Sequence, residues 1–398
     1  MASSSSVDTR RAVDRLMRFL AVEGVTGQEQ AIARAVSDEL VRIGVPKKAI
    51  RHDNAHKQIP LPTQTGNLIV HLPGTRKGDR LLFMTHLDTV PLCAGAKPVR
   101  KGKRISAAGP TALGGDNRTG VAVLVTLVET LLRHELDHPP LTLLFTVREE
   151  SGLWGARCLK TVDLKNPAMG FNVDGRLPQQ ITIGAVGAER WHAEITGLAS
   201  HAGAHPEQGI SATMVAALAL AEVQQQGYFG KVQVDGKEGS SNIGSFGGSD
   251  GASAGTATNV VTDYVLLRGE SRSHDAKFVS KITAAYREAL SGAARGLPNS
   301  EGKTAKVRFE ARQEYYPFKL KADAPVVKHA MAAATGLGLQ PELRTTNGGL
   351  DANWLVRHGI PTVTIGAGQH NIHTISEFVD LDMFLDGCRL AVALAESK

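Results

Sequence analysis

The chain has 398 residues, 42% hydrophobic and 21% charged, which is typical of a globular protein large enough for two or more domains. Its net charge of +6 is mild, and its most apolar long segment, residues 121–132, contains Glu129 and is too short to cross a bilayer. Three widely spaced cysteines suggest no disulfide framework, so the composition favours a reducing cytosol over secretion: Cys93, Cys158 and Cys388.

The N-terminal part of the chain predicts a short tail followed by two helices. Residues 1–6 contain no apolar signal core and are expected to form a disordered tail. Apolar residues recur at helical spacing over residues 8–22 and 28–43, and Gly44 and Pro46 mark the end of the second helix.

Short apolar runs then alternate with helices. Most of these runs are continuous rather than alternating, as expected for strands that are buried on both faces of a sheet. The pattern predicts a three-layer α/β domain around a sheet with substantial parallel character. The predicted strands are Asn67–Leu72, Arg80–His86, Leu141–Val147, Ala168–Val173 and Pro361–Ile365.

A basic run follows the second of these strands and has two interpretations. It could form a patch that binds anions or nucleic acid, or a solvated hairpin. No aromatic residues interleave to stack bases, so the sequence favours the hairpin and no nucleic-acid partner. The run consists of Lys97, Arg100, Lys101, Lys103 and Arg104.

Between about residue 187 and residue 315 the pattern changes to that of a small α+β domain inserted into the larger one. The predicted domains are therefore 1–186 plus 316–398, and 187–315. The insert contains predicted strands at 189–197, 257–268 and Lys306–Arg312, predicted helices at 209–226 and 275–294, and a Gly/Ser-rich loop or hairpin tip at 239–256. A further helix is predicted near 323–335, before the last strand.

Histidines and carboxylates gather where the predicted strands of the larger domain end. In an open α/β sheet, ligands bind at the carboxyl ends of the strands, so residues far apart in sequence can converge there. The residues in such positions are His86, Asp88, Asp116, Glu149, Glu150, Asp174 and His373.

Each of these residues also has a plainer interpretation when it is taken alone. His86 resembles a structural histidine, Asp116 a helix N-cap, and Asp174, which precedes a glycine, a turn residue. The pair Glu149 and Glu150 resembles a solvated loop. If all of these plainer interpretations were right, the residues would lie at one edge of one sheet only by chance, so we favour a common site.

Two histidines with several carboxylates suit zinc or a similar divalent ion. The acidic groups exceed what one catalytic zinc needs, and two cations would offset their charge. A carboxylate between the cations would bridge them, and an unligated carboxylate could take a proton from water.

The segments around these residues resemble a known family. This family comprises dinuclear-zinc exopeptidases and deacylases, and it includes tripeptide aminopeptidase (peptidase T), glutamate carboxypeptidase, aminoacylase and succinyl-diaminopimelate desuccinylase. The resemblance covers nearly the whole chain, in family order. The matching segments are Thr85–Pro91, Gly115–Gly120, Arg148–Gly152, Asn172–Gly175, Ser200–Gly203 with Pro206 and Gly209, Gly348–Asn353 and Asn371–Thr374.

The resemblance implies a role for each residue at the strand ends. His86, Asp116 and Asp174 would hold one zinc ion, and Asp116, Glu150 and His373 would hold the other, with cobalt or manganese as alternatives to zinc. Asp88 would orient His86. Glu149 would be the general base that activates water and then protonates the leaving amine.

The resemblance also implies that the insert is a ferredoxin-like lid and dimerisation domain. His201 would reach the active site of the partner subunit in a homodimer, although an exposed loop histidine is an equally good interpretation. Asn259 and Arg272 would contact the substrate, with a surface salt bridge as the plain alternative for Arg272. Gly348 and Gly349 would let the backbone approach the substrate.

The sequence therefore predicts a cytoplasmic, two-zinc exopeptidase that acts on short peptides. Aspartate at position 174 and the segment Gly348–Asn353 resemble the peptidase T-like aminopeptidases. The alternatives are a deacylase of N-acyl amino acids or a carboxypeptidase of the same family. A more distant alternative is a non-catalytic binding protein, but all the expected ligands and the base are present.

Overall fold

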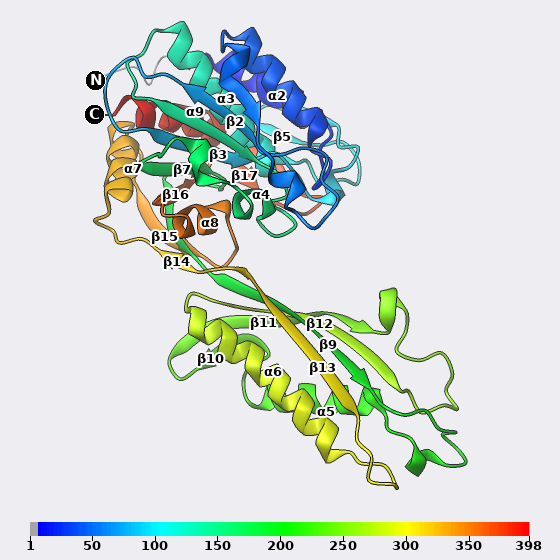
Figure 1. Ribbon diagram of the computed structural model, residues 1–398. Helices are drawn as coiled ribbons and strands as arrows, with labels where there is room; N and C mark the ends of the chain where they lie inside the picture. Colours follow the sequence, from blue (N-terminus) through cyan, green and yellow to red (C-terminus); the bar gives the residue numbers. More distant parts are fainter. Residues whose placement is uncertain (1–6, 398) are drawn as a thin grey trace. The chain divides into compact units, whose positions relative to one another are not determined.

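The chain folds into two compact units, each with its own core (Figure 1). The computed structural model describes residues 7–397, so the tail expected at residues 1–6 lies outside the described residues. Val186–Phe318 and Asn347–Gly349 form the smaller unit, and the remaining described residues form the larger. Within residues 7–397, every helix is too short or too polar to cross a membrane.

The larger unit is built on a nine-stranded mixed sheet in the order β1-β2-β6-β3-β7-β16-β8-β14, with β15 paired to β8. The neighbours β6-β3-β7-β16 run parallel at its centre, which confirms the predicted fold class. All five predicted strands form, each within one residue of its expected bounds. The strands are β1 (Ile50–His52), β2 (Leu68–Leu72), β3 (Leu81–His86), β6 (Leu141–Thr146), β7 (Met169–Val173), β8 (Gln180–Ala185), β14 (Phe318–Lys319), β15 (Glu342–Thr346) and β16 (Thr362–Ile365).

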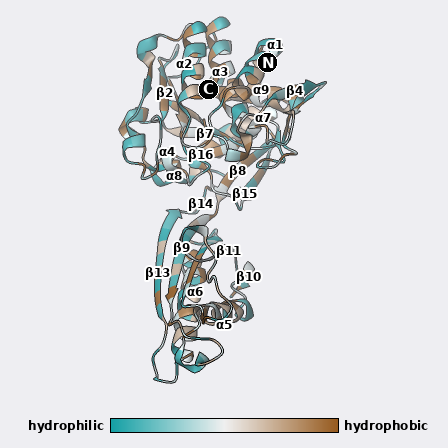
Figure 2. Cartoon of the chain, turned by 90° about the vertical axis from the view of Figure 1, so that its right-hand side faces the viewer, coloured by the Kyte–Doolittle hydropathy of each residue, from teal (hydrophilic) through white to brown (hydrophobic). Residues whose placement is uncertain are grey.

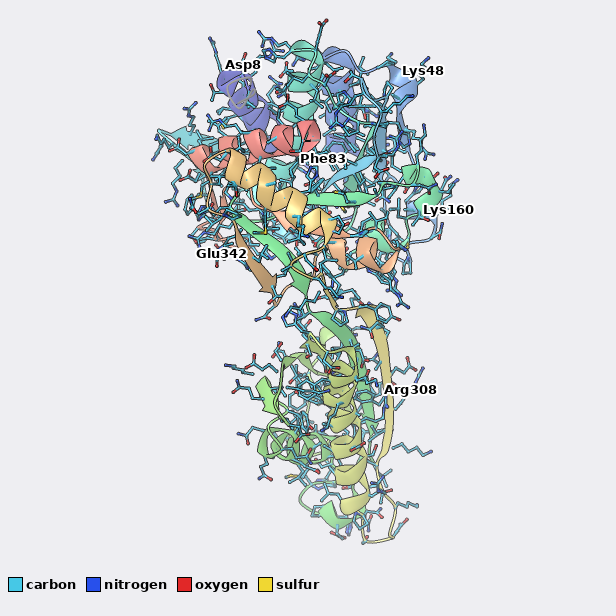
Figure 3. The ribbon with its side chains drawn as sticks, turned by 90° about the vertical axis from the view of Figure 1, so that its left-hand side faces the viewer. Asp8, Lys48, Phe83, Lys160, Arg308 and Glu342 are labelled. Carbon is cyan, nitrogen blue, oxygen red and sulfur yellow. The ribbon has the colours of Figure 1, made fainter. Side chains whose placement is uncertain are left out.

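Helices cover both faces of this sheet, which explains why its central strands are continuous apolar runs. The helices packed on one face are α1 (Thr9–Leu20), α2 (Gln30–Arg42), α3 (Gly115–Arg133), α7 (Pro325–Gly336) and α9 (Leu381–Glu396). On the other face, α4 (Trp154–Arg157) and α8 (Asp351–Arg357) pack on Leu82 and Met84 of β3. Phe83, labelled in Figure 3, points to the first face and packs against Phe171 with the rings tilted by 37° and their centroids 5.3 Å apart. Burial of each such side chain contributes roughly 1.5–3 kcal/mol to the free energy of unfolding.

Buried charges also join the helices of the first face. Arg15 is fully buried, and its guanidinium donates to Glu39 at 3.0 Å and to Glu129 at 2.5 Å. Burial alone would raise the pKa of Glu39, but the hydrogen bond from Arg42 and the charges of three arginines lower it to about 2. Glu39 therefore remains ionised in the core and ties α2 to α1.

The basic run forms a hairpin, as the sequence favoured. Strands β4 (Pro98–Lys101) and β5 (Arg104–Ala107) pair antiparallel and join β18 (Phe378–Asp380) and β17 (Gln369–His370) in a four-stranded sheet. The guanidinium of Arg104 lies 3.7 Å above the ring of Phe378. The hairpin thus packs against the segment that follows the last central strand.

The smaller unit is a five-stranded antiparallel sheet, in the order β10-β11-β12-β9-β13, with two helices packed on it. Its core is formed by Trp191 and Tyr286, whose ring centroids lie 4.6 Å apart, and by small apolar residues of the helices. Figure 2 shows the edge strand β13 mostly in the hydrophilic colours. The elements are β9 (Gly187–Thr196), α5 (Ala212–Gln225), β10 (Gly230–Val234), β11 (Lys237–Gly247), β12 (Tyr264–Ser273), α6 (Ala276–Gly296) and β13 (Lys306–Tyr315).

The prediction of a loop or hairpin tip at 239–256 is wrong over its first half, because residues up to Gly247 belong to strand β11. Small residues are needed there, since a Cβ at Gly239 would lie 2.8 Å from Ile282 of α6. Ser241 is buried and donates to the carbonyl of Tyr228. The strand predicted at 257–268 begins later, at Tyr264.

Candidate metal centre

Three neighbouring parallel strands deliver site residues to the same edge of the larger sheet. Strand β3 ends at His86, β6 is followed by Glu149 and Glu150, and β7 is followed directly by Asp174. Parallel neighbours end on the same side of a sheet, so these groups converge at its carboxyl edge. Asp116 joins them from the first turn of α3, and His373 from the loop between β17 and β18.

Two clusters of potential ligand atoms share Asp116. Nε2 of His86 lies 3.2 Å from Oδ1 of Asp116 and 3.8 Å from Oδ1 of Asp174. Nε2 of His373 lies 3.2 Å from Oδ2 of Asp116 and 3.0 Å from Oε2 of Glu150. The two oxygens of Asp116 thus face different histidines, which is the arrangement that a bridging carboxylate requires.

Glu149 lies beside these clusters. Its carboxylate, that of Glu150 and a ring nitrogen of His86 have atoms within 4.8 Å of one another. Burial is the main cause that raises the pKa of Glu149 well above its ordinary value, and the nearby charges of Glu150 and Asp174 add to it. A carboxylate with a raised pKa is suited to exchanging protons near neutral pH.

The surrounding carboxylates raise the pKa of both histidines. Burial by itself lowers the pKa of His86, but hydrogen bonds to Asp116, Asp174 and Asp88 outweigh it and raise the pKa well above its usual value. Hydrogen bonds to Asp116 and then to Glu150 raise the pKa of His373 to about 10. Burial raises the pKa of Glu150 to about 7. The site therefore concentrates negative charge that protons neutralise in part.

The donor set fits divalent metal ions. Imidazole nitrogens and carboxylate oxygens are the ligands of zinc and similar ions in hydrolases, and the carboxylates here outnumber the histidines. Nδ1 of His86 lies 3.0 Å from the backbone oxygen of Asp88, which leaves Nε2 directed at Asp116. Holding one ring nitrogen in this way orients the other as a ligand. Among the described residues, all clusters of this kind lie at this sheet edge.

The carboxylate of Asp88 accepts hydrogen bonds from two backbone N–H groups. Its Oδ1 accepts from the backbone N–H of Glu149 at 3.0 Å, and its Oδ2 accepts from that of Glu150 at 3.1 Å. Its Oδ1 is 3.4 Å from Nδ1 of His86. Asp88 thus contacts both His86 and the turn that carries the two glutamates.

Four buried residues near the site were not predicted from the sequence. Glu377 accepts from the backbone N–H groups of Leu113, Gly114 and Asp116 at 2.7, 2.8 and 3.0 Å, so it holds the turn before α3. Gln369 lies 3.3 Å from Asp116, and Asp351 accepts from Thr146. Glu29 accepts from the backbone of Arg148. Asp351 and Gln369 stood near segments that the sequence singled out, whereas Glu29 and Glu377 did not. All four residues have partners in distant parts of the chain.

The remaining predicted site residues belong to the smaller unit. Nδ1 of the exposed His201 accepts from the backbone of Gly203 and Ala204. Arg272 forms a two-point ion pair with Glu270, with N–O distances of 2.9 and 3.0 Å. A Cβ at Gly349 would lie 2.5 Å from the ring of Tyr315, which explains the glycine there. Asn259 presents its backbone oxygen to Ala202, and Gly348 is adjacent to Gly349. Their roles toward a substrate stay predictions.

A buried acid beside paired clusters of nitrogen and oxygen atoms is the arrangement expected of a metal-dependent hydrolase. Within that class, the chain belongs to the family described as Peptidase family M20/M25/M40, which matches residues 82–397. The protein is therefore a hydrolase and a metallopeptidase, as the resemblance implied.

Similar proteins cover nearly the whole chain. It is 31% identical over 396 residues to the uncharacterized protein YqjE of Bacillus subtilis (strain 168), covering 98% of this chain and 99% of that one. The crystal structure of the aminopeptidase PepT from Bacillus cereus superposes with a TM-score of 0.84 at 31% identity, covering 98% and 99%. A tripeptidase from Staphylococcus aureus superposes with a TM-score of 0.87 at 27% identity, covering 98% of each chain.

The first prediction concerns protons at this site. A metal ion binds neutral imidazole, whereas the metal-free site raises the pKa of His373 to about 10 and that of His86 well above its usual value, so both rings favour the protonated form. Binding of divalent ions to the metal-free protein should therefore release about one proton per imidazole. Titration calorimetry in two buffers with different ionisation enthalpies measures this release. Equal heats in both buffers would show that the histidines are not protonated or do not bind metal.

Proposed function

We propose that the protein is a two-zinc aminopeptidase that removes the N-terminal residue from short peptides such as tripeptides. The observation that carries the proposal is the sharing of Asp116 by two ligand clusters with the buried Glu149 beside them. The names of the similar structures, an aminopeptidase and a tripeptidase, support the choice of substrate end.

In this proposal His86, Asp116 and Asp174 hold one metal ion, and Asp116, Glu150 and His373 hold the other. When bound, the ions would supply Lewis acidity at the scissile carbonyl and lower the pKa of water. Asp88 would keep the ring of His86 in place and hold the turn of the two glutamates.

Glu149 would act as the general base and then as the general acid. It takes no part in either of the clusters that share Asp116, and burial raises its pKa. Such a carboxylate can accept a proton from the attacking water and deliver it to the leaving amine.

The smaller unit would supply contacts to the substrate. We propose that His201, Asn259, Arg272, Gly348 and Gly349 serve this purpose. Arg272 would bind a substrate carboxylate in place of that of Glu270, which its guanidinium holds at two points in the free protein.

Glu149→Gln should retain both metal ions but lower kcat by about 10²–10⁴-fold, because the amide cannot take the proton from water. Steady-state kinetics on a tripeptide, together with metal analysis of the purified variant, measure this separation. Glu135→Gln, which changes an exposed glutamate in the same way, should match the wild type. A kcat for Glu149→Gln close to that of the wild type would remove Glu149 from the role of base.

Two blocked tripeptides distinguish an aminopeptidase from a deacylase or a carboxypeptidase. The zinc-, cobalt- or manganese-loaded enzyme should cleave a tripeptide whose C-terminus is amidated and reject one whose N-terminus is acetylated. Mass spectrometry of the released amino acids measures both reactions. Preferred hydrolysis of the acetylated peptide would indicate a deacylase or a carboxypeptidase, and no hydrolysis of any peptide would favour a binding protein.

We also propose that the protein is a cytoplasmic homodimer that associates through the smaller unit. Met214 and Leu218 lie one turn apart on α5, and both are exposed, at 50% and 45%. The free cysteines suit a reducing compartment. Light scattering should give about twice the chain mass of 42.3 kDa, and Leu218→Glu should lower it. A wild-type mass equal to that of one chain would contradict the dimer.

A further inference from the structure

The turn that carries Glu149 and Glu150 is held by carboxylates from two other parts of the chain. It begins at Arg148, whose φ of 54° lies in the left-handed region that non-glycine residues seldom adopt. Three consecutive backbone N–H groups, those of Arg148, Glu149 and Glu150, donate to carboxylate oxygens. Asp88 accepts the second and third of these hydrogen bonds, and Glu29 accepts the first.

Glu29 is fully buried and lies 119 residues before Arg148 in the sequence. Its Oε1 accepts from the backbone N–H of Gly27 at 2.7 Å and from that of Arg148 at 3.1 Å. Its Oε2 is buried and has no hydrogen-bond partner among the described residues. Both hydrogen bonds of this carboxylate therefore depend on a single oxygen.

Helix capping does not account for Glu29. The residue stands at the N-cap position of α2, but its side chain accepts no hydrogen bond from the first turn of that helix. The carboxylate is instead directed back to Gly27 and across to the turn. A capping role would also not require a fully buried carboxylate, which is costly to desolvate unless nearby groups stabilise it.

Burial and the nearby charge of Asp88 raise the pKa of Glu29 to about 7, while hydrogen bonds from backbone N–H groups act in the opposite direction. Arg118 is buried, and its guanidinium donates to the backbone oxygens of Leu87 and Val22. Burial lowers the pKa of Arg118 to about 10, while the charges of Asp88 and Glu29 act in the opposite direction. The charge of Arg118 thus interacts with both carboxylates that hold the turn, but it does not offset the burial of Glu29, whose direct contacts are the backbone N–H groups.

We propose that Glu29 is a positioning residue that holds the backbone of Arg148 and thereby sets the place of the Glu149 carboxylate. The proposal rests on the proposed function, in which Glu149 is the general base. Asp88 holds the backbone N–H groups of both Glu149 and Glu150, but the carboxylate of Glu150 is also fixed by its contact with His373. Loss of Glu29 therefore acts mainly on the carboxylate of Glu149. Small displacements of a reacting group can lower a rate by about 100-fold.

Two substitutions separate the acceptor oxygen from the charge. Glu29→Met removes the acceptor with little change in length and should lower kcat by about 10–100-fold, with metal content retained and KM changed less than about threefold. Glu29→Gln keeps an oxygen for both N–H groups and should stay within about threefold of the wild type. Amide hydrogen exchange of residues 147–152 in the metal-free protein should accelerate in Glu29→Met and not in Glu29→Gln.

Glu39→Met is the matched control, because Glu39 is a second buried glutamate of the same region, near the other end of α2, and it contacts arginines rather than the turn. This variant should lower Tm and leave kcat unchanged. In the double variant Glu29→Met with Glu149→Gln, kcat should lie within about threefold of that of Glu149→Gln alone, because the base that Glu29 positions is already absent.

The outcomes distinguish this proposal from the proposed function. If the wild type hydrolyses tripeptides but Glu29→Met keeps its kcat and its amide exchange, the role of Glu29 is wrong while the function stands. Equal losses in Glu29→Met and Glu39→Met, or full additivity with Glu149→Gln, would reduce Glu29 to a general structural residue. A metal-loaded wild type without turnover of any peptide would contradict both proposals.

Discussion

The structure of the larger unit depends on compensating the charge of the many carboxylates that it buries at one edge of its sheet. Buried charge is costly unless hydrogen bonds, opposite charges or metal ions compensate for it. At this edge the compensation comes from two histidines, from backbone N–H groups of the turns, and from the buried guanidinium of Arg118. The remaining negative charge is what makes the edge suited to divalent ions.

These carboxylates divide into two sets by what they contact. Asp116, Asp174 and Glu150 face histidine nitrogens and form the candidate ligand clusters. Asp88, Glu29 and Glu377 accept hydrogen bonds from backbone N–H groups, and so hold the turns that carry the first set. By holding the turn backbone, the second set gives the side chains of the first set defined positions at the site. Binding of a metal ion requires such defined ligand positions.

The hydrophobic layers provide the rigid support for this arrangement. Helices on both faces of the sheet bury β3 and β6 completely and β7 from Gly170 onward, and these are the strands whose ends deliver His86, Glu149 and Asp174. The apolar interior also lowers the local dielectric, so the pKa values of buried acids such as Glu149 and Asp351 rise. Packing and electrostatics are thus coupled at the sheet edge.

The sequence by itself determined the central strands, the two histidines and the ring of carboxylates, because continuous apolar runs ending in polar residues are local signals of buried parallel strands. It also determined the family, through short segments in a shared order. Only the tertiary structure decided that Gly239 and Ser241 lie in a strand, since the absence of a Cβ at Gly239 leaves room for Ile282 of α6 and the hydroxyl of Ser241 donates to the carbonyl of Tyr228. It likewise revealed Glu29 and Glu377, whose partners in the turns at the site lie 119 and 261 or more residues away. A single buried glutamate carries no periodic or motif signal, and its function follows from the backbone groups that the completed fold places beside it.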